Sequence, residues 1–242
     1  MLPSDVIGVT VLNQKTGSFE FRKGPLFANV VLADEINRTP PKAQSALLEA
    51  MSEYQISNDG VTYPLPEPFI VLATQNPIEY EGTYNLPESQ LDRFLLRVDI
   101  GYPGDEDELH IMRRRDPRPV LRSLPSVWSA QDVLDMQQRA GSVMVEESVA
   151  RYILAIVQET RQHDLIQLGA SPRASLAFYE ACQARALVEG RDYALPDDVK
   201  ALAVPVLSHR ILVRSRDSNP AAAAASRVRA VDDIVKRVPV PR

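Results

Sequence analysis

Two adjacent carboxylates, Asp34 and Glu35, follow directly after the apolar run FANVVLA. This run lacks polar alternation, so it predicts a strand that is buried on both faces, as in a parallel sheet. Ligand sites in open α/β sheets lie beyond the carboxyl ends of the strands. At that position the first acid can hold Mg²⁺ through its water shell, and the second can orient or deprotonate an attacking water.

Such a pair is typical of a Walker-B element, although adjacent acids also occur at strand ends by chance. A second apolar run, FIVLATQ, is followed by Asn76, whose amide can donate to a γ-phosphate oxygen and position water. The alternative is that Asn76 and Pro77 only form a turn. Because two successive core strands end in polar groups at one sheet edge, the sequence favours the functional interpretation.

Two arginines are further candidates. Arg93 precedes a third predicted strand, FLLRVDI over residues 94–100. One interpretation is that Arg93 forms an exposed ion pair with Asp92, which would contribute little to stability. The other is that Arg93 is an arginine finger, which stabilises charge on a transferred phosphoryl group in a neighbouring subunit. Arg173 lies in the first turn of a predicted helix, where a cation opposes the helix dipole at a cost of about 0.3–1 kcal/mol. An anionic ligand would offset that cost, whereas a solvated arginine would tolerate it.

The elements that position these residues divide the chain into an α/β part over residues 1–104 and a helical part over residues 105–215. The α/β part contains two predicted hairpins, at residues 9–22 and 55–65, the second with an Asp-Gly turn. After Thr39 and Pro40, which mark a helix start, Ala43, Leu47, Leu48 and Met51 form the apolar stripe of one predicted helix. Further helices are predicted in the segments PESQLDRF, DELHIMRRR, SAQDVLDMQQRA, EESVARYILAIVQETRQH, PRASLAFYEACQARALVEG and PDDVKALAVPVLSHRI. Residues 216–242 are predicted to be a polar tail without regular structure.

Composition excludes several classes of protein. The 242 residues are 45% hydrophobic and 24% charged, the balance of a globular protein and not of a disordered one. No run approaches the roughly 20 apolar residues of a membrane helix, and no secretory signal is present, so we expect a cytoplasmic protein without a membrane span. The single cysteine, Cys182, fits a reducing compartment. Residues 1–104 carry 7 Lys and Arg against 13 Asp and Glu, which argues against a nucleic-acid partner.

The strings VVLADEINR, LATQNP, LPESQLDRFLL and GASPRAS, in this order, resemble the MoxR family of AAA+ ATPases over nearly the whole chain. The resemblance implies that Asp34 and Glu35 form Walker B, that Asn76 is sensor 1, that Arg93 is the arginine finger and that Arg173 is sensor 2. Asp34, Glu35, Asn76 and Arg173 would then bind ATP, and Asp34 would also hold the Mg²⁺. The implied fold is α/β: a partial P-loop NTPase core with a parallel sheet and two inserted hairpins, followed by a helical lid.

Family members are ring-forming, chaperone-like ATPases. The resemblance therefore implies a homo-oligomeric ring, expected to be a hexamer. It also implies a client protein complex that the ring assembles or activates, and a partner protein with a von Willebrand factor A domain.

One departure from the family pattern is serious. The family carries a phosphate-binding loop of the type G-x-x-x-x-G-K-S/T, and this chain contains no Gly-Lys dipeptide. We therefore expect an N-terminally truncated chain that is inactive alone and lacks a strand between those at residues 69–75 and 94–100. The alternative is a short, non-hydrolysing interaction subunit that lends Arg93 to an intact neighbour. The retention of Glu35, Asn76 and Arg173 favours truncation.

Overall fold

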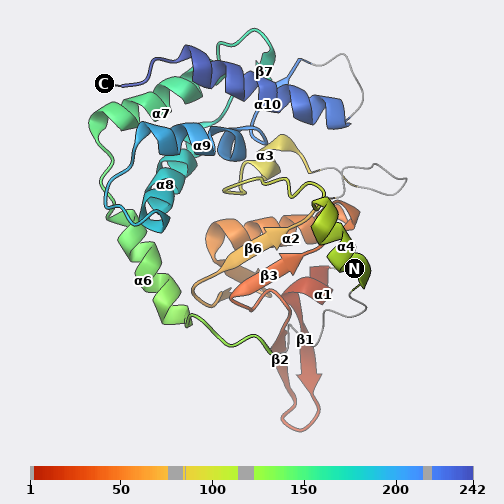
Figure 1. Cartoon of the computed structure of the whole chain (residues 1–242). Coiled ribbons are helices and arrows are strands. Elements are labelled where there is room, and N and C mark those ends of the chain that lie inside the picture. The colour runs from red at the N-terminus through yellow and green to blue at the C-terminus, as the bar shows by residue number, and fades with distance from the viewer. Residues whose placement is uncertain (1–2, 76–83, 85, 114–122, 215–219, 242) are drawn as a thin grey trace.

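The computed structural model describes residues 3–75, 84, 86–113, 123–214 and 220–241. Figure 1 shows a small α/β half below and most of the helical half above, with α3 between them and α6 on the left beside the α/β half. The α/β half consists of α1 (Pro3–Ile7), β1 (Gly8–Asn13), β2 (Ser18–Lys23), β3 (Val30–Ala33), the 3₁₀ helix η1 (Ile36–Arg38), α2 (Pro41–Glu53), β4 (Gln55–Asn58), β5 (Val61–Pro64), β6 (Ile70–Ala73) and α3 (Glu88–Leu91).

The helical half begins after α4 (Asp105–Arg113), a helix with no buried residue. Its elements are α6 (Ala130–Gly141), α7 (Glu147–Thr160), β7 (Ile166–Leu168), α8 (Pro172–Val188), α9 (Pro196–Leu207), β8 (Leu212–Val213) and α10 (Pro220–Arg237). The helices predicted from apolar spacing are confirmed, and the β7–β8 pair is an addition that the sequence did not indicate. The division of the chain at residue 104 stays a prediction.

A parallel strand pair forms the centre of the α/β half. β3 and β6 pair in register from Val30 opposite Ile70 to Ala33 opposite Ala73, as the two apolar runs predicted. The buried side of this half is built around α2, whose Leu47 and Leu48 pack with Leu26 and Ile36. The chain that follows β3 therefore runs directly from the sheet edge into the core helix.

Both predicted hairpins are present and lie against each other. β1 pairs with β2, and β4 pairs with β5, both antiparallel. Phe21 of the first hairpin stacks on Tyr63 of the second, with ring centroids 4.5 Å apart. Asn58 and Asp59 at the tip of the second hairpin both hydrogen-bond to the Thr10 hydroxyl, at 2.9 and 2.6 Å. The two insertions thus behave as one packed unit.

The third strand predicted over residues 94–100 is wrong, because this segment has no regular structure. Its backbone groups bond to the helical half instead. The Phe94 carbonyl accepts from the His209 imidazole and the Arg210 guanidinium, and the Arg97 amide donates to the Pro205 carbonyl. A strand needs a neighbour for these groups, and here the helical half takes that role.

The unstructured tail predicted over residues 216–242 is also wrong. α10 spans 18 residues and buries Ala230, Val231 and Ile234 in the core of the helical half. Those three positions share one face of a helix, so tertiary packing accounts for the order of this segment. No helix among the described residues has the length and apolar character to cross a bilayer.

Candidate functional site

The two acids lie at the carboxyl end of β3, where Thr74, the residue that follows β6, joins them. The Thr74 hydroxyl donates to the Asp34 carboxylate at 2.5 Å and accepts from the Glu35 amide at 2.9 Å. The Ile36 amide donates to the Thr74 carbonyl at 3.0 Å. Thr74 therefore fixes both the side chain of Asp34 and the backbone of Glu35.

Glu35 has a left-handed backbone, with φ 47° and ψ 52°. This conformation costs a non-glycine residue roughly 1–2 kcal/mol and persists where the surrounding contacts over-determine it. Here the Thr74 contacts supply that constraint. The Glu35 carboxylate is partly exposed and lies 3.2 Å from Arg38 Nε, in an exposed pair that contributes little and leaves the carboxylate available.

Gln44 anchors the loop after the acids from the core side. Its buried side-chain amide donates to the Ile36 carbonyl at 3.0 Å and to the Tyr84 carbonyl at 3.1 Å. The Tyr84 amide in turn donates to the Asn37 carbonyl at 2.6 Å. The loop that follows β3 is thus tied to the segment that leads into α3.

The expected sensor amide, Asn76, lies outside the described residues. Thr74, two residues before it, is adjacent to Asp34 and Glu35. β3 and β6 end at the same sheet edge, with Ala33 opposite Ala73. The chain therefore leaves β6 beside the two acids, as expected. The placement of the Asn76 side chain stays a prediction.

Arg93 packs against the later part of α2. Its Nη1 donates to the Leu48 carbonyl at 3.1 Å and to the Ser52 hydroxyl. Seven residues of helix separate Pro41 from Leu48, a rise of about 10 Å. In the described part of the chain no hydrogen bond or ion pair joins Arg93 to Asp34 or Glu35. Arg93 therefore lies away from the acids of its own chain.

The alternative that Arg93 only pairs with Asp92 is wrong. The Asp92 carboxylate accepts from Arg210 Nε at 3.0 Å and from the Ser171 hydroxyl at 2.8 Å. Ser171 caps α8, and Arg173 stands exposed two residues later. Burial lowers the pKa of the Arg210 guanidinium; the Asp92 carboxylate opposes this shift, and the charge of Arg173 adds to it.

Sequence reasoning thus missed three contributors to the region: Thr74, Gln44 and Arg210. Thr74 had a signal, since it follows an apolar strand as Asp34 does. Gln44 and Arg210 had none, because a polar residue in a helix or turn gives no sign of being buried against a distant backbone.

The chemistry of the Asp34 carboxylate suits Mg²⁺. The carboxylate is exposed and has a hydroxyl neighbour, and Mg²⁺ is typically held by one or two carboxylates, water and phosphate oxygens. Within the described ranges no group of three or more His, Cys, Asp or Glu side chains could hold a metal by itself. Any Mg²⁺ here would therefore arrive with a phosphate ligand.

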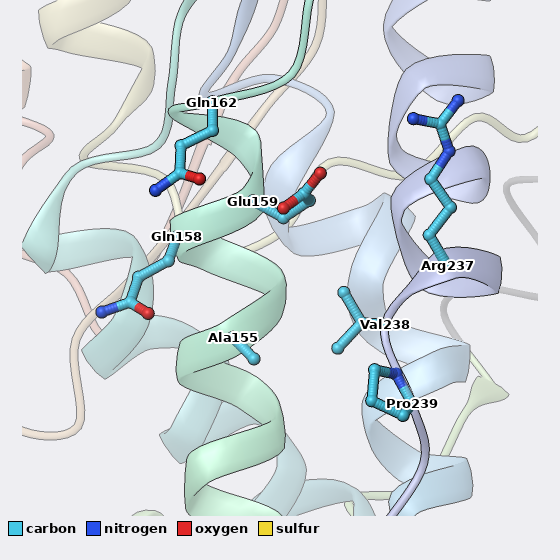
Figure 2. A pocket seen from close by; sticks show the side chains of 7 residues that line it. All are labelled: Ala155, Gln158, Glu159, Gln162, Arg237, Val238 and Pro239. Carbon is cyan, nitrogen blue, oxygen red and sulfur yellow. The ribbon is translucent and has the colours of Figure 1, made fainter.

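A separate shallow pocket of about 410 Å³ lies between α7 and the end of α10 (Figure 2). Glu159 and Arg237 line it together with Val238 and Pro239. None of the candidate residues lines this pocket, so it is not part of the site.

Comparison with known proteins agrees with this architecture. Residues 1–96 match the model of the ATPase family associated with various cellular activities, and residues 158–237 match the AAA lid domain. A crystal structure of a proposed ATPase from Cytophaga hutchinsonii is similar over the whole chain, with a TM-score of 0.85 and 39% identity, and 75% of that chain is covered. The predicted fold class, a parallel-sheet α/β AAA core followed by a helical lid, is confirmed.

Two protein relatives are similar along most of the chain. Uncharacterized protein YeaC of Bacillus subtilis is 48% identical over 242 residues, covering all of this chain and 75% of the relative. Chaperone MoxR1 of Mycobacterium tuberculosis is 42% identical over 222 residues, covering 88% of this chain and 58% of the relative. The chain thus spans three quarters of the first relative and less than two thirds of the second.

Proposed function

The chain belongs to the MoxR family of AAA+ ATPases, and we propose that it supplies the Walker-B acids, the lid and a trans-acting arginine of a chaperone-like ATPase ring. The observation that carries this proposal is the joint anchoring of Asp34 and Glu35 by Thr74, at the shared carboxyl edge of two parallel strands. Ligands of open parallel sheets bind at this edge.

In the proposed reaction, ATP with Mg²⁺ is hydrolysed, and the metal neutralises charge on the phosphates when bound. Asp34 would hold the metal. Glu35 orients the attacking water and accepts its proton, and the Asn76 amide positions the same water. Arg173, on the first turn of α8, contacts the phosphates.

We assign Arg93 to the nucleotide of a neighbouring subunit. Its contacts with Leu48 and Ser52 place it along α2, away from the acids of its own chain. An arginine that acts across an interface can increase turnover by about 10³–10⁵-fold.

The phosphate-binding loop is proposed to come from polypeptide outside these 242 residues, since they contain no Gly-Lys dipeptide. We refer to a polypeptide that joins these residues to such a loop as the loop-containing protein. The 242-residue chain alone is expected to show no ATP binding by calorimetry. Micromolar binding would contradict this account of the loop.

Members of the AAA+ family typically assemble into oligomeric rings. For this protein we propose a hexameric homo-oligomer in the cytoplasm that acts on a client protein complex, with a von Willebrand factor A domain protein as partner. The relative named Chaperone MoxR1 supports the chaperone-like role. Sedimentation of the loop-containing protein with and without ATP would test the ring.

The decisive experiment measures ATP hydrolysis by the loop-containing protein and its Glu35→Gln variant. We expect the amide to keep ATP affinity and to lower turnover by at least about 100-fold, because it cannot accept the proton of water. Glu49→Gln, which makes the same exchange at an exposed position of α2, serves as the control and should hydrolyse normally. Wild-type turnover in Glu35→Gln would remove Glu35 from this role.

The role across subunits is tested by mixing. Arg93→Ala should lose hydrolysis and keep nucleotide affinity. An equal mixture with Glu35→Gln should recover activity, because roughly one interface in four then pairs intact acids with an intact arginine. No recovery would count against Arg93 acting on a neighbouring subunit.

A further inference from the structure

Arg210 joins the helical half to the segment that carries Arg93. Its side chain is only 1% exposed, and it lies in the turn between α9 and β8. Its Nε donates to the Asp92 carboxylate at 3.0 Å, its Nη1 to the Leu95 carbonyl at 3.0 Å, and its Nη2 to the Phe94 carbonyl at 2.6 Å. One buried guanidinium therefore binds three of the four residues 92–95.

Further bonds from the helical half reach the same segment. The Ser171 hydroxyl donates to the second Asp92 oxygen at 2.8 Å, and the His209 imidazole donates to the Phe94 carbonyl at 3.0 Å. The Arg97 amide donates to the Pro205 carbonyl at 2.9 Å. The start of α8, the end of α9 and the turn after it thus hold residues 92–97 together.

On the other side, the Arg93 guanidinium rests on α2 through the Leu48 carbonyl and the Ser52 hydroxyl. The Phe94 side chain also packs against the apolar core of the α/β half. The segment is therefore held from two sides, by the buried Arg210 guanidinium of the helical half and by the Arg93 and Phe94 contacts with the α/β half.

We propose that Asp92 and Arg210 are positioning residues, whose buried pair couples the place of Arg93 to the orientation of the helical half. This inference rests on the proposed role of Arg93 across subunits. Asp92 bonds to the residue that caps α8, and α8 carries Arg173 in its first turn. A phosphate contact at Arg173 in one subunit is thereby transmitted to Arg93 at the next nucleotide.

The first test measures amide hydrogen exchange in the 242-residue chain. Arg210→Lys keeps the charge but loses the planar fork that reaches Asp92 and two carbonyls. We expect the Arg97 amide to exchange at least about tenfold faster in this variant, with α8 amides unchanged. Arg191→Lys is the matched control, because Arg191 also pairs with a buried carboxylate, that of Asp198, but inside the helical half. Equal exchange at Arg97 in wild type and Arg210→Lys would overturn the proposal.

The second test separates positioning of Arg93 from a structural role in the same subunit. In the loop-containing protein, Arg210→Lys should lower kcat at least about tenfold with KM within about twofold, and Arg191→Lys should leave both unchanged. Mixing Arg210→Lys with Glu35→Gln should recover activity, because Glu35→Gln subunits supply a correctly placed Arg93 to the intact acids of Arg210→Lys subunits. A defect confined to the subunit's own nucleotide site would give no recovery.

The outcomes distinguish this inference from the proposed function. If the Arg93→Ala mixture with Glu35→Gln fails to recover, the role of Arg93 across subunits is wrong. If that mixture recovers and the Arg210→Lys mixture does not, only the positioning role is wrong. Should Arg210→Lys fail to fold, Asp92→Asn replaces it in both tests, with the same expected exchange at Arg97 and the same recovery on mixing.

Discussion

The helical half and the α/β half differ in how much of their apolar surface they bury. In the helical half α7, α8, α9 and α10 enclose a core in which Ile156, Phe178 and Ile234 are fully buried. In the α/β half β3 and β6 expose apolar side chains: Leu32 is 66% and Leu72 51% exposed. Parallel sheets are ordinarily covered on both faces.

The difference indicates that the helical half contributes most of the stability, whereas the α/β half carries the candidate catalytic acids. The helical half closes its own core, and its buried ion pairs lie among its own helices or against residues 92–95. The α/β half carries the acids on a sheet that is covered on one side by α2. We therefore expect substitutions to have large effects at the enclosed positions of the helical half and small ones at the exposed apolar positions of the α/β half.

The largest contrast is expected for one substitution made in both halves. Phe178→Ala should lower the free energy of unfolding by about 3–5 kcal/mol, because it removes a fully buried ring and leaves a cavity. Phe19→Ala, at a side chain 74% exposed on β2, should change it by less than about 0.5 kcal/mol. Urea denaturation followed by circular dichroism measures both, and equal losses would contradict the division.

Substitution of Asp198 is expected to have the next largest effect on stability. Burial would raise the pKa of its carboxyl, but hydrogen bonds from Arg191 and the Leu195 amide hold the pKa below its ordinary value. Asp198→Asn should lower the free energy of unfolding by about 3 kcal/mol, because Arg191 loses its charged partner. The adjacent, exposed Asp197→Asn should leave the urea midpoint unchanged. Similar midpoints for the two variants would show that the Asp198 pair is not stabilising.

His209 gives a pH-dependent effect at the contact between the halves. Burial, and after it the charge of Arg210, lower the pKa of its imidazole from 6.5 to about 4. Between these values the unfolded chain binds a proton that the folded chain does not, so stability falls as pH falls. The loss from pH 6.5 to 4 is expected to be about 2–3 kcal/mol.

The control for this effect is His209→Gln, whose amide can still donate to the Phe94 carbonyl but does not titrate. Denaturation at several pH values should show a smaller acid-induced loss in this variant than in wild type. Parallel pH profiles would mean that His209 titrates alike in the folded and unfolded chain.

The smallest effect is expected at the start of α6. Ser129 caps this helix: its hydroxyl accepts from the Asp132 amide at 3.2 Å, in a reciprocal capping box. Ser129→Ala should lower the free energy of unfolding by about 1 kcal/mol. Faster amide exchange confined to the first turn of α6 would confirm the cap, and unchanged exchange would contradict it.

Local patterns in the sequence were sufficient for much of the fold. The Asp-Gly turn and alternating side chains predicted the hairpins, and unbroken apolar runs predicted the parallel pair of β3 and β6. Asp34 and Glu35 were found because they follow such a run directly. Each of these signals arises within a few residues of chain, where periodicity and turn chemistry act.

Residues 94–97 and α10 could not be predicted in the same way. The first segment has the composition of a strand, yet its carbonyls accept from His209 and Arg210. α10 follows a polar stretch, and burial of Val231 and Ile234 against other helices orders it. In both cases the deciding partner is distant in the chain, so local preference is overridden by packing.

The sequence by itself determined which residues could do chemistry: two acids after an apolar strand, an amide after the next, and two arginines. Only the tertiary structure decided that Thr74 anchors the acids and that Asp92 pairs with Arg210, 118 residues away. The reason is physical. A residue's type and spacing fix what its side chain can bond to, but the bond forms only where folding brings the partner within about 3 Å.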